Sequence, residues 1–122
     1  MTGARQQAWR FGRIAETLCV WCLRLQGYRV LARRYRSPVG EIDIVAKRGR
    51  TVAIVEVKAR ARANDAAEAL TVRQRLRIAR AASAFLQAHP ALGTCDVRFD
   101  AMALTRWQWP LHVRDAWRPD PM

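Results

Sequence analysis

Residues 40–60 read GEIDIVAKRGRTVAIVEVKAR and organise the predicted fold. Two runs rich in Ile and Val flank the sequence KRGR at residues 47–50, and a glycine in such a linker is typical of a β-hairpin turn. We therefore predict two antiparallel strands over roughly residues 41–47 and 51–60. Each predicted strand also carries charged residues among its apolar ones, and their placement is the most informative feature of the sequence.

The charged residues of the hairpin fall on defined faces. Side chains at i and i+2 of a strand point the same way. Glu41 and Asp43 therefore share one face of the first strand, and Glu56 and Lys58 share one face of the second. The hairpin can thus gather Asp43, Glu56 and Lys58 into one patch. Two carboxylates beside an ammonium group suit a Mg²⁺-dependent phosphodiesterase, because carboxylate oxygens bind the metal and the cation acts near the phosphate. The alternative is an ordinary amphipathic hairpin with one solvated face.

The presence of lysine at position 58 favours a catalytic role for this residue over a role that needs only positive charge. Of the 22 basic residues, only Lys47 and Lys58 are lysines and the remaining 20 are arginines. A position that needed only positive charge would usually be arginine in this chain. A lysine ammonium is a compact point charge that approaches water or a phosphate oxygen closely and can change its protonation state.

The first predicted helix spans residues 7–26. Glu16 is its only acid, and a carboxylate on so apolar a helix needs either a partner or solvent. Cys19 and Cys22 have redox-motif spacing, but they lie in mid-helix without paired histidines, so we interpret them as buried thiols. The predicted core stripe comprises Phe11, Ile14, Ala15, Leu18, Cys22 and Leu25, widened by Val20, Trp21 and Leu23.

The remaining elements complete an α/β pattern. We predict a strand over 28–36, a helix over 71–88 that ends before Pro90, a strand over 95–104 and a short edge strand over 109–117. This order, helix–strand–strand–strand–helix–strand, fits a mixed sheet flanked by helices in one domain of 122 residues. The predicted core side of the second helix comprises Val72, Leu76, Ala79, Ala82, Ser83 and Leu86, with Phe85 beside them.

Net charge and hydropathy indicate which classes of partner the protein binds and where in the cell it is expected. The formal net charge is +12, which favours a polyanionic partner such as nucleic acid. No apolar run approaches the roughly 18–20 residues of a membrane span, and the N-terminus lacks a signal-peptide pattern. We therefore expect a cytoplasmic protein without a membrane partner, and the sequence leaves a homodimer open.

The hairpin resembles a known nuclease signature. Asp43, followed after twelve residues by Glu56-Val57-Lys58, matches the PD-(D/E)XK pattern, in which an Asp and a Glu-x-Lys lie on adjacent strands. With its surroundings, the chain resembles the YraN-like family of predicted bacterial endonucleases, related to archaeal Holliday-junction resolvases, over residues 8–117. The surrounding matches are Gly12, Ala15, Glu16, Leu23, Gly27, Tyr28 and Arg98-Phe99-Asp100.

The resemblance implies a restriction-endonuclease-like fold and a metal-dependent DNA endonuclease that uses Mg²⁺ or Mn²⁺, with branched or flapped DNA as the expected substrate. Asp43, Glu56 and the Val57 carbonyl would bind metal, Lys58 would act on the attacking water, and Glu16 would reach the metal site from the helix. Asp100 would instead be a structural partner for an arginine. Phosphate contacts are expected from Arg60, Arg62, Arg73 and Arg77, and accessory roles from Glu41 and Gln74.

Two departures from the family pattern are Gln74, where lysine is common, and Arg34, where asparagine is usual. The alternatives are a catalytically weak nucleic-acid-binding protein of nuclease fold in DNA repair or recombination, and an RNA-binding factor. Grouped carboxylates argue against both, because they repel phosphates unless a cation intervenes.

Overall fold

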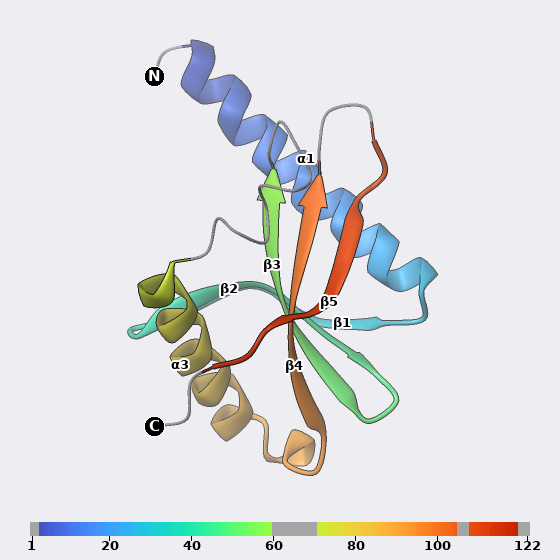
Figure 1. Ribbon diagram of the computed structural model, residues 1–122, viewed down its shortest axis with the longest axis vertical. Helices are drawn as coiled ribbons and strands as arrows, with labels where there is room; N and C mark the ends of the chain where they lie inside the picture. Colours follow the sequence, from blue (N-terminus) through green and yellow to red (C-terminus); the bar gives the residue numbers. More distant parts are fainter. Residues whose placement is uncertain (1–2, 60–70, 105–107, 120–122) are drawn as a thin grey trace.

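The computed structural model describes residues 3–59, 71–104 and 108–119, and it contains a five-stranded mixed sheet with helices on both faces (Figure 1). Strand order in the sheet follows the sequence, β1-β2-β3-β4-β5. Only β3 and β4 are parallel, and the segment joining them carries helix α3. The predicted fold class, a mixed sheet flanked by helices, is confirmed.

Element bounds lie close to those predicted. The elements are α1 (Gly3–Leu25), β1 (Arg29–Ser37), β2 (Gly40–Arg48), β3 (Thr51–Ala59), α3 (Val72–Ala88), the short 3₁₀ helix η1 (Pro90–Leu92), β4 (Asp96–Leu104) and β5 (Leu111–Trp117). Within the described ranges, no helix is long and apolar enough to cross a membrane.

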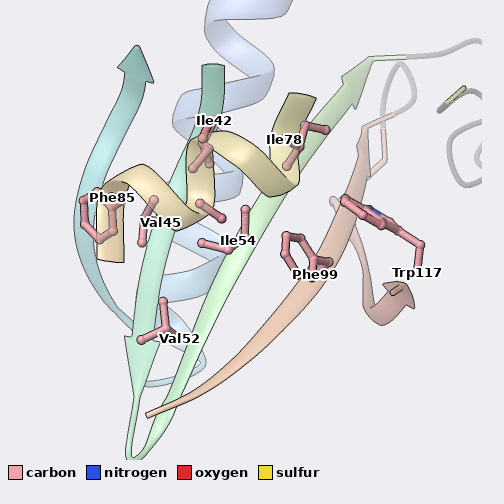
Figure 2. Packing of buried hydrophobic residues seen from close by; sticks show 10 residues of the cluster. Ile42, Val45, Val52, Ile54, Ile78, Phe85, Phe99 and Trp117 are labelled. Atoms are coloured by element: carbon pink, nitrogen blue, oxygen red, sulfur yellow. The ribbon is translucent and has the colours of Figure 1, made fainter. Parts of the chain in front are cut away.

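The sheet separates two hydrophobic clusters, each covered by one helix. The cluster under α3 includes Ile42, Val45, Val52, Ile54, Ile78, Ala81, Ala82, Phe85, Phe99 and Trp117 (Figure 2). The cluster under α1 includes Cys19, Val20, Cys22, Leu23, Tyr28, Ile44, Ala46, Ala53, Val55 and Met102. Full burial of each large aliphatic or aromatic side chain contributes roughly 1.5–3 kcal/mol, so these clusters provide most of the fold's stability.

Helix α1 faces the sheet differently from the prediction. Ile14, Trp21 and Leu25 were assigned to the core but are 56%, 53% and 75% exposed. The prediction is confirmed for Ala15, Val20, Cys22 and Leu23, which are buried, and the buried face also carries Glu16 and Cys19. The helix is apolar on several sides, so periodicity alone could not fix its rotation. The rotation accompanies pairing of Glu16 with β1, described below.

The two cysteines of α1 are buried free thiols, as predicted. Burial is the main factor that raises the pKa of the Cys19 thiol to about 12. At neutral pH that thiol is protonated and a poor nucleophile or metal ligand.

Helix α3 is also rotated relative to the prediction. Val72 and Leu76 were assigned to the core but are 73% and 40% exposed, and Ser83 is exposed as well. Ala82 and Phe85 are buried as predicted, and Ile78 and Ala81 complete the face that packs on the sheet. The rest of the predicted stripe lies beside the core, where much of it lines a surface groove.

Candidate active site

The two acids of the hairpin face α3. Strands β2 and β3 pair from Ile44 opposite Val55 to Arg48 opposite Thr51, and one further step of this register would place Asp43 opposite Glu56. Glu56 lies two residues from Ile54, which belongs to the cluster under α3, so its carboxylate shares that face of the sheet. Ile42 and Val45 both belong to this cluster, so alternation alone assigns Asp43 to neither face, but its side chain lines the same cleft as Glu56 and α3.

A side chain replaces the backbone ladder at this point. The Val57 N–H donates to Asp43 Oδ2 at 2.8 Å, beyond the last backbone pair of β2 and β3. The bond fixes the Asp43 carboxylate against β3. The bond also places the Val57 backbone beside Asp43. A residue whose carbonyl is predicted to bind the same metal as Asp43 would be expected in this position.

The acids open into a polar cleft between the hairpin and α3. Lys58 Nζ lies 3.4 Å from Glu56 Oε1, and these side chains are only 13% and 16% exposed. The structure thus brings Asp43, Glu56 and Lys58 together and adds one cation from α3, Arg77. The full lining is Glu41, Asp43, Glu56, Lys58, Gln74, Arg77 and Ile78.

Too little positive charge surrounds the carboxyl groups of Asp43 and Glu56 for both of them to ionise easily. Burial, followed by the charge of Asp43, raises the pKa of Glu56 to about 8, although Lys58 opposes the shift. Burial also raises the pKa of Asp43, against the opposing bonds from the Val57 N–H and Glu56. The pair therefore retains a proton near neutral pH, with the Glu56 carboxyl hydrogen-bonded to Asp43.

This donor set fits a hard divalent cation. A cation between the carboxylates would replace the shared proton and allow both groups to ionise. In the described part of the chain, no third His, Cys, Asp or Glu completes a compact ligand group with them. Water and a backbone carbonyl would supply the other ligands, which suits Mg²⁺ because it keeps much of its hydration shell.

Close packing at Gly40 sets the position of α3 over the cleft. A Cβ atom on Gly40 would lie 2.4 Å from the Arg77 carbonyl oxygen, so only glycine permits this approach. The contact holds Arg77 and Ile78 over the acids of β2. Sequence reasoning missed this role of Gly40, and it also missed Ile78. The available signal for Gly40 was a glycine at the start of a strand.

Gln74 lines the cleft but is already engaged. Its Oε1 accepts from the Thr71 N–H at 2.9 Å, while its own N–H donates to Thr71 Oγ1 at 3.1 Å. This capping box starts α3 and leaves Gln74 a structural role at the cleft rim. Arg73 is exposed and does not line the cleft, and Arg60 and Arg62 lie outside the described residues.

Glu16, which the resemblance leads us to expect at the metal site, does not line this cleft and is paired with two arginines of β1. Arg33 Nη2 donates to Glu16 Oε1 at 3.2 Å and Arg34 Nε donates to Oε2 at 3.0 Å. Arg34 has φ of 52°, and this left-handed residue interrupts strand alternation, so that neighbouring side chains reach one carboxylate. The two arginines satisfy Glu16 and anchor α1 to β1.

Asp100 forms a second buried acidic site, on β4. Arg98 donates to it twice at 2.8 Å, His112 Nε2 lies 2.7 Å away, and the Asp115 N–H donates at 3.0 Å. Burial would raise the pKa of Asp100, but these bonds together lower it to about 2. As predicted, this aspartate is a structural partner for an arginine, and it joins β4 to β5 where their register shifts.

Comparison with known proteins places the whole chain in one group. The chain is 53% identical over 112 residues to a protein from Parvibaculum lavamentivorans, covering 92% of this chain and 84% of that protein. It is 50% identical over 121 residues to one from Paramagnetospirillum magneticum, covering 96% and 94%. Both relatives are named only as UPF0102 proteins. The model of that family matches residues 15–104, and the chain therefore belongs to the uncharacterised protein family UPF0102.

Proposed function

We propose that this protein is a metal-dependent endonuclease that hydrolyses phosphodiester bonds in DNA. The observation that carries the proposal is the Asp43–Glu56 pair, whose carboxyl groups lie beside Lys58 in a cleft open to solvent, with few donors around them. A purely structural pair of acids would be expected to have enough donors to ionise both members. These two have the arrangement expected of cation ligands.

Each residue of the cleft has a distinct role in this proposal. Asp43 and Glu56 would hold the cation, and the Val57 backbone would add a carbonyl ligand. When bound, Mg²⁺ or Mn²⁺ supplies positive charge at the scissile phosphate and polarises its oxygens. Lys58, held 3.4 Å from Glu56, would orient the attacking water and offset the charge that develops on phosphorus.

The cations around the cleft favour a nucleic-acid substrate. Arg77 lines the cleft beside the acids, where its guanidinium can hold a flanking phosphate. The formal net charge of +12 would strengthen backbone contacts that do not depend on base sequence. Branched or flapped DNA is the substrate class that we propose to test first, because the chain resembles junction resolvases.

The decisive experiment compares the two lysines of the chain. Purified wild-type protein is incubated with branched, flapped, single-stranded and duplex DNA, and with an RNA hairpin, in Mg²⁺, Mn²⁺ or EDTA. Lys58→Ala and Lys58→Arg should abolish cleavage while DNA affinity persists, because arginine retains the charge but not the compact ammonium. Lys47→Ala is the matched control and should cleave normally, because Lys47 does not line the cleft.

A second candidate is a nucleic-acid-binding protein with negligible turnover. It is favoured by the pairing of Glu16 with two arginines, which leaves the central acids without a third carboxylate from α1. Salt-sensitive DNA binding, with no cleavage by wild-type protein in either metal, would establish this candidate and exclude the endonuclease. Equal cleavage by wild type and Lys58→Ala would instead identify a contaminating nuclease.

A further inference from the structure

Helix α3 carries a second functional face, on the side away from the acids. A groove of about 450 Å³ runs between this face and β4. Its walls include Val72 and Leu76 on the helix and Val97 on the strand, which are 73%, 40% and 38% exposed. Figure 2 shows Phe99 on the strand that forms the other wall. This groove contains much of the stripe that the sequence predicted to be core, and no described residue covers it.

Arginines surround this apolar floor. Arg75, Arg80 and Arg118 line the groove, and no acidic residue lines it in the ranges that the structure describes. Arg118 pairs with Asp115 at 2.9 Å, beyond one end of the groove. Arg75 and Arg80, by contrast, make no ion pair with any described carboxylate. Among the described residues, the rim along α3 is therefore positively charged and uncompensated.

Arg75 provides an independent sign that an acceptor is missing. Its guanidinium lies over the Trp117 ring, 5.8 Å from the centroid, and its Nε is buried without a hydrogen-bond partner among the described residues. An unsatisfied buried donor costs roughly 1–3 kcal/mol. A carboxylate that reached the guanidinium from the groove would recover part of that cost.

The apolar floor and the arginine rim favour one class of ligand for the groove over the others. A second copy of this chain would bring another +12 charge against an arginine rim. Nucleic acid would supply negative charge, but the groove offers no exposed aromatic side chain for stacking, since Phe99 is only 7% exposed. An acidic amphipathic helix satisfies both requirements, because apolar residues fill the floor and flanking carboxylates meet the arginines.

We propose that this groove docks a short amphipathic helix from an acidic partner protein, with carboxylates directed at Arg75 and Arg80. From Val72 to Leu86 the helical rise gives a length of about 21 Å, which corresponds to a partner segment of about 14–16 residues. The cleft uses Gln74, Arg77 and Ile78 of the same helix, so the partner can bind without covering the acids. The proposal does not depend on catalysis.

The test uses the full-length protein and two synthetic probes. The first is a helical peptide of about 16 residues, with leucines at i, i+4, i+7 and i+11 and glutamates flanking them. The second is identical except that every glutamate is lysine. Affinity is measured by fluorescence anisotropy, and the site is mapped by amide chemical shifts in ¹⁵N-labelled protein. We expect binding of the acidic peptide alone, with shifts in α3 and β4.

Variants locate the contact. Arg80→Glu and Leu76→Gln should each weaken binding by about tenfold or more, the scale expected for a desolvated charge or apolar anchor. Arg73→Glu is the matched control, since Arg73 lies on the same helix, is exposed and does not line the groove. It should change affinity less than about threefold. Circular dichroism shows whether each variant remains folded.

Several results would overturn the proposal. These are equal binding of the two peptides, equal weakening by Arg73→Glu and Arg80→Glu, or no groove shifts up to about millimolar acidic peptide. Sedimentation equilibrium provides the last test, because it measures the oligomeric state. If the protein is a dimer that Leu76→Gln dissociates, the groove is occupied by a second copy and not by an acidic partner.

Discussion

Asp43 and Asp100 are aspartates of one sheet with opposite electrostatic environments. Asp100 is fully buried, yet it accepts two bonds from Arg98 and one from the Asp115 N–H, and it contacts His112. Asp43 accepts one backbone N–H and contacts the carboxyl of Glu56. Accordingly, the pKa of Asp100 is lowered and the pKa of Asp43 is raised.

The comparison separates a structural acid from a candidate ligand. Burial acts on both, so burial alone does not decide the charge state. The number and charge of the donors decide it. Around Asp100 the protein supplies them, and around Asp43 and Glu56 it leaves a deficit that a cation can fill.

The largest expected effect comes from removing each acid in turn. Asp100→Ala should lower the free energy of unfolding by about 3–5 kcal/mol, because it leaves Arg98 without its carboxylate. Asp43→Asn should leave stability unchanged or raise it, because it removes a poorly compensated charge. Urea denaturation of both variants measures the contrast. Equal destabilisation by the two changes would remove the distinction between the sites.

The pH dependence of stability should differ in sign between the sites. The pKa of Glu56 rises from an ordinary 4.5 to about 8, so the folded state binds the extra proton. Its contribution in metal-free protein is fully present below pH 4.5 and is lost as pH rises through about 8. Asp100 contributes above its ordinary 3.8 and loses that contribution as pH falls through about 2.

Glu56→Gln sharpens this second prediction. The variant should remove the decline in stability on the alkaline side while leaving the loss at acid pH intact, because the Asp100 network is unchanged. Chemical denaturation of metal-free protein, from about pH 2 to about pH 9, follows both limbs. An alkaline decline of the same size in Glu56→Gln would assign it to other groups.

Gly40→Ala tests whether the position of α3 maintains the cleft. The added Cβ would meet the Arg77 carbonyl at 2.4 Å, and such overpacking costs about 1–3 kcal/mol. We expect amide shifts at Arg77 and Ile78 but none around Asp100. Gly49→Ala is a useful contrast, since Gly49 has φ of 60° but no atom within 4 Å of the added carbon. Its effect should therefore stay within the hairpin turn.

The smallest expected effect is stabilisation by the cation. At a Mg²⁺ or Mn²⁺ concentration ten times its dissociation constant, stability should rise by about 1.4 kcal/mol. Binding should also release protons near pH 7, because the cation replaces the proton retained by the Asp43–Glu56 pair. Calorimetry in buffers of different ionisation enthalpy measures that release. Asp43→Asn should lose it, whereas Asp96→Asn, outside the cleft, should not.

The parts of the fold and site that were predictable from sequence were those governed by local geometry. Strand alternation places Glu56 and Lys58 on one face, and the antiparallel register of the hairpin brings Asp43 beside them where the backbone ladder ends. The rotation of each helix was not predictable, because long-range contacts determine it. Glu16 meets two arginines of β1, and Gly40 admits the backbone of α3. Neither contact can be predicted from the hydrophobic periodicity of the helix sequences.

The division of α3 between cleft and groove restricts how this helix can change in length. Each residue turns a helix by about 100°, so a one-residue insertion after Ile78 would point the residues beyond it away from their present neighbours. Phe85 would leave the core, and Leu86 would leave the groove. A seven-residue insertion returns the faces to within about 20°, so length variants within α3 that still fold should favour such steps.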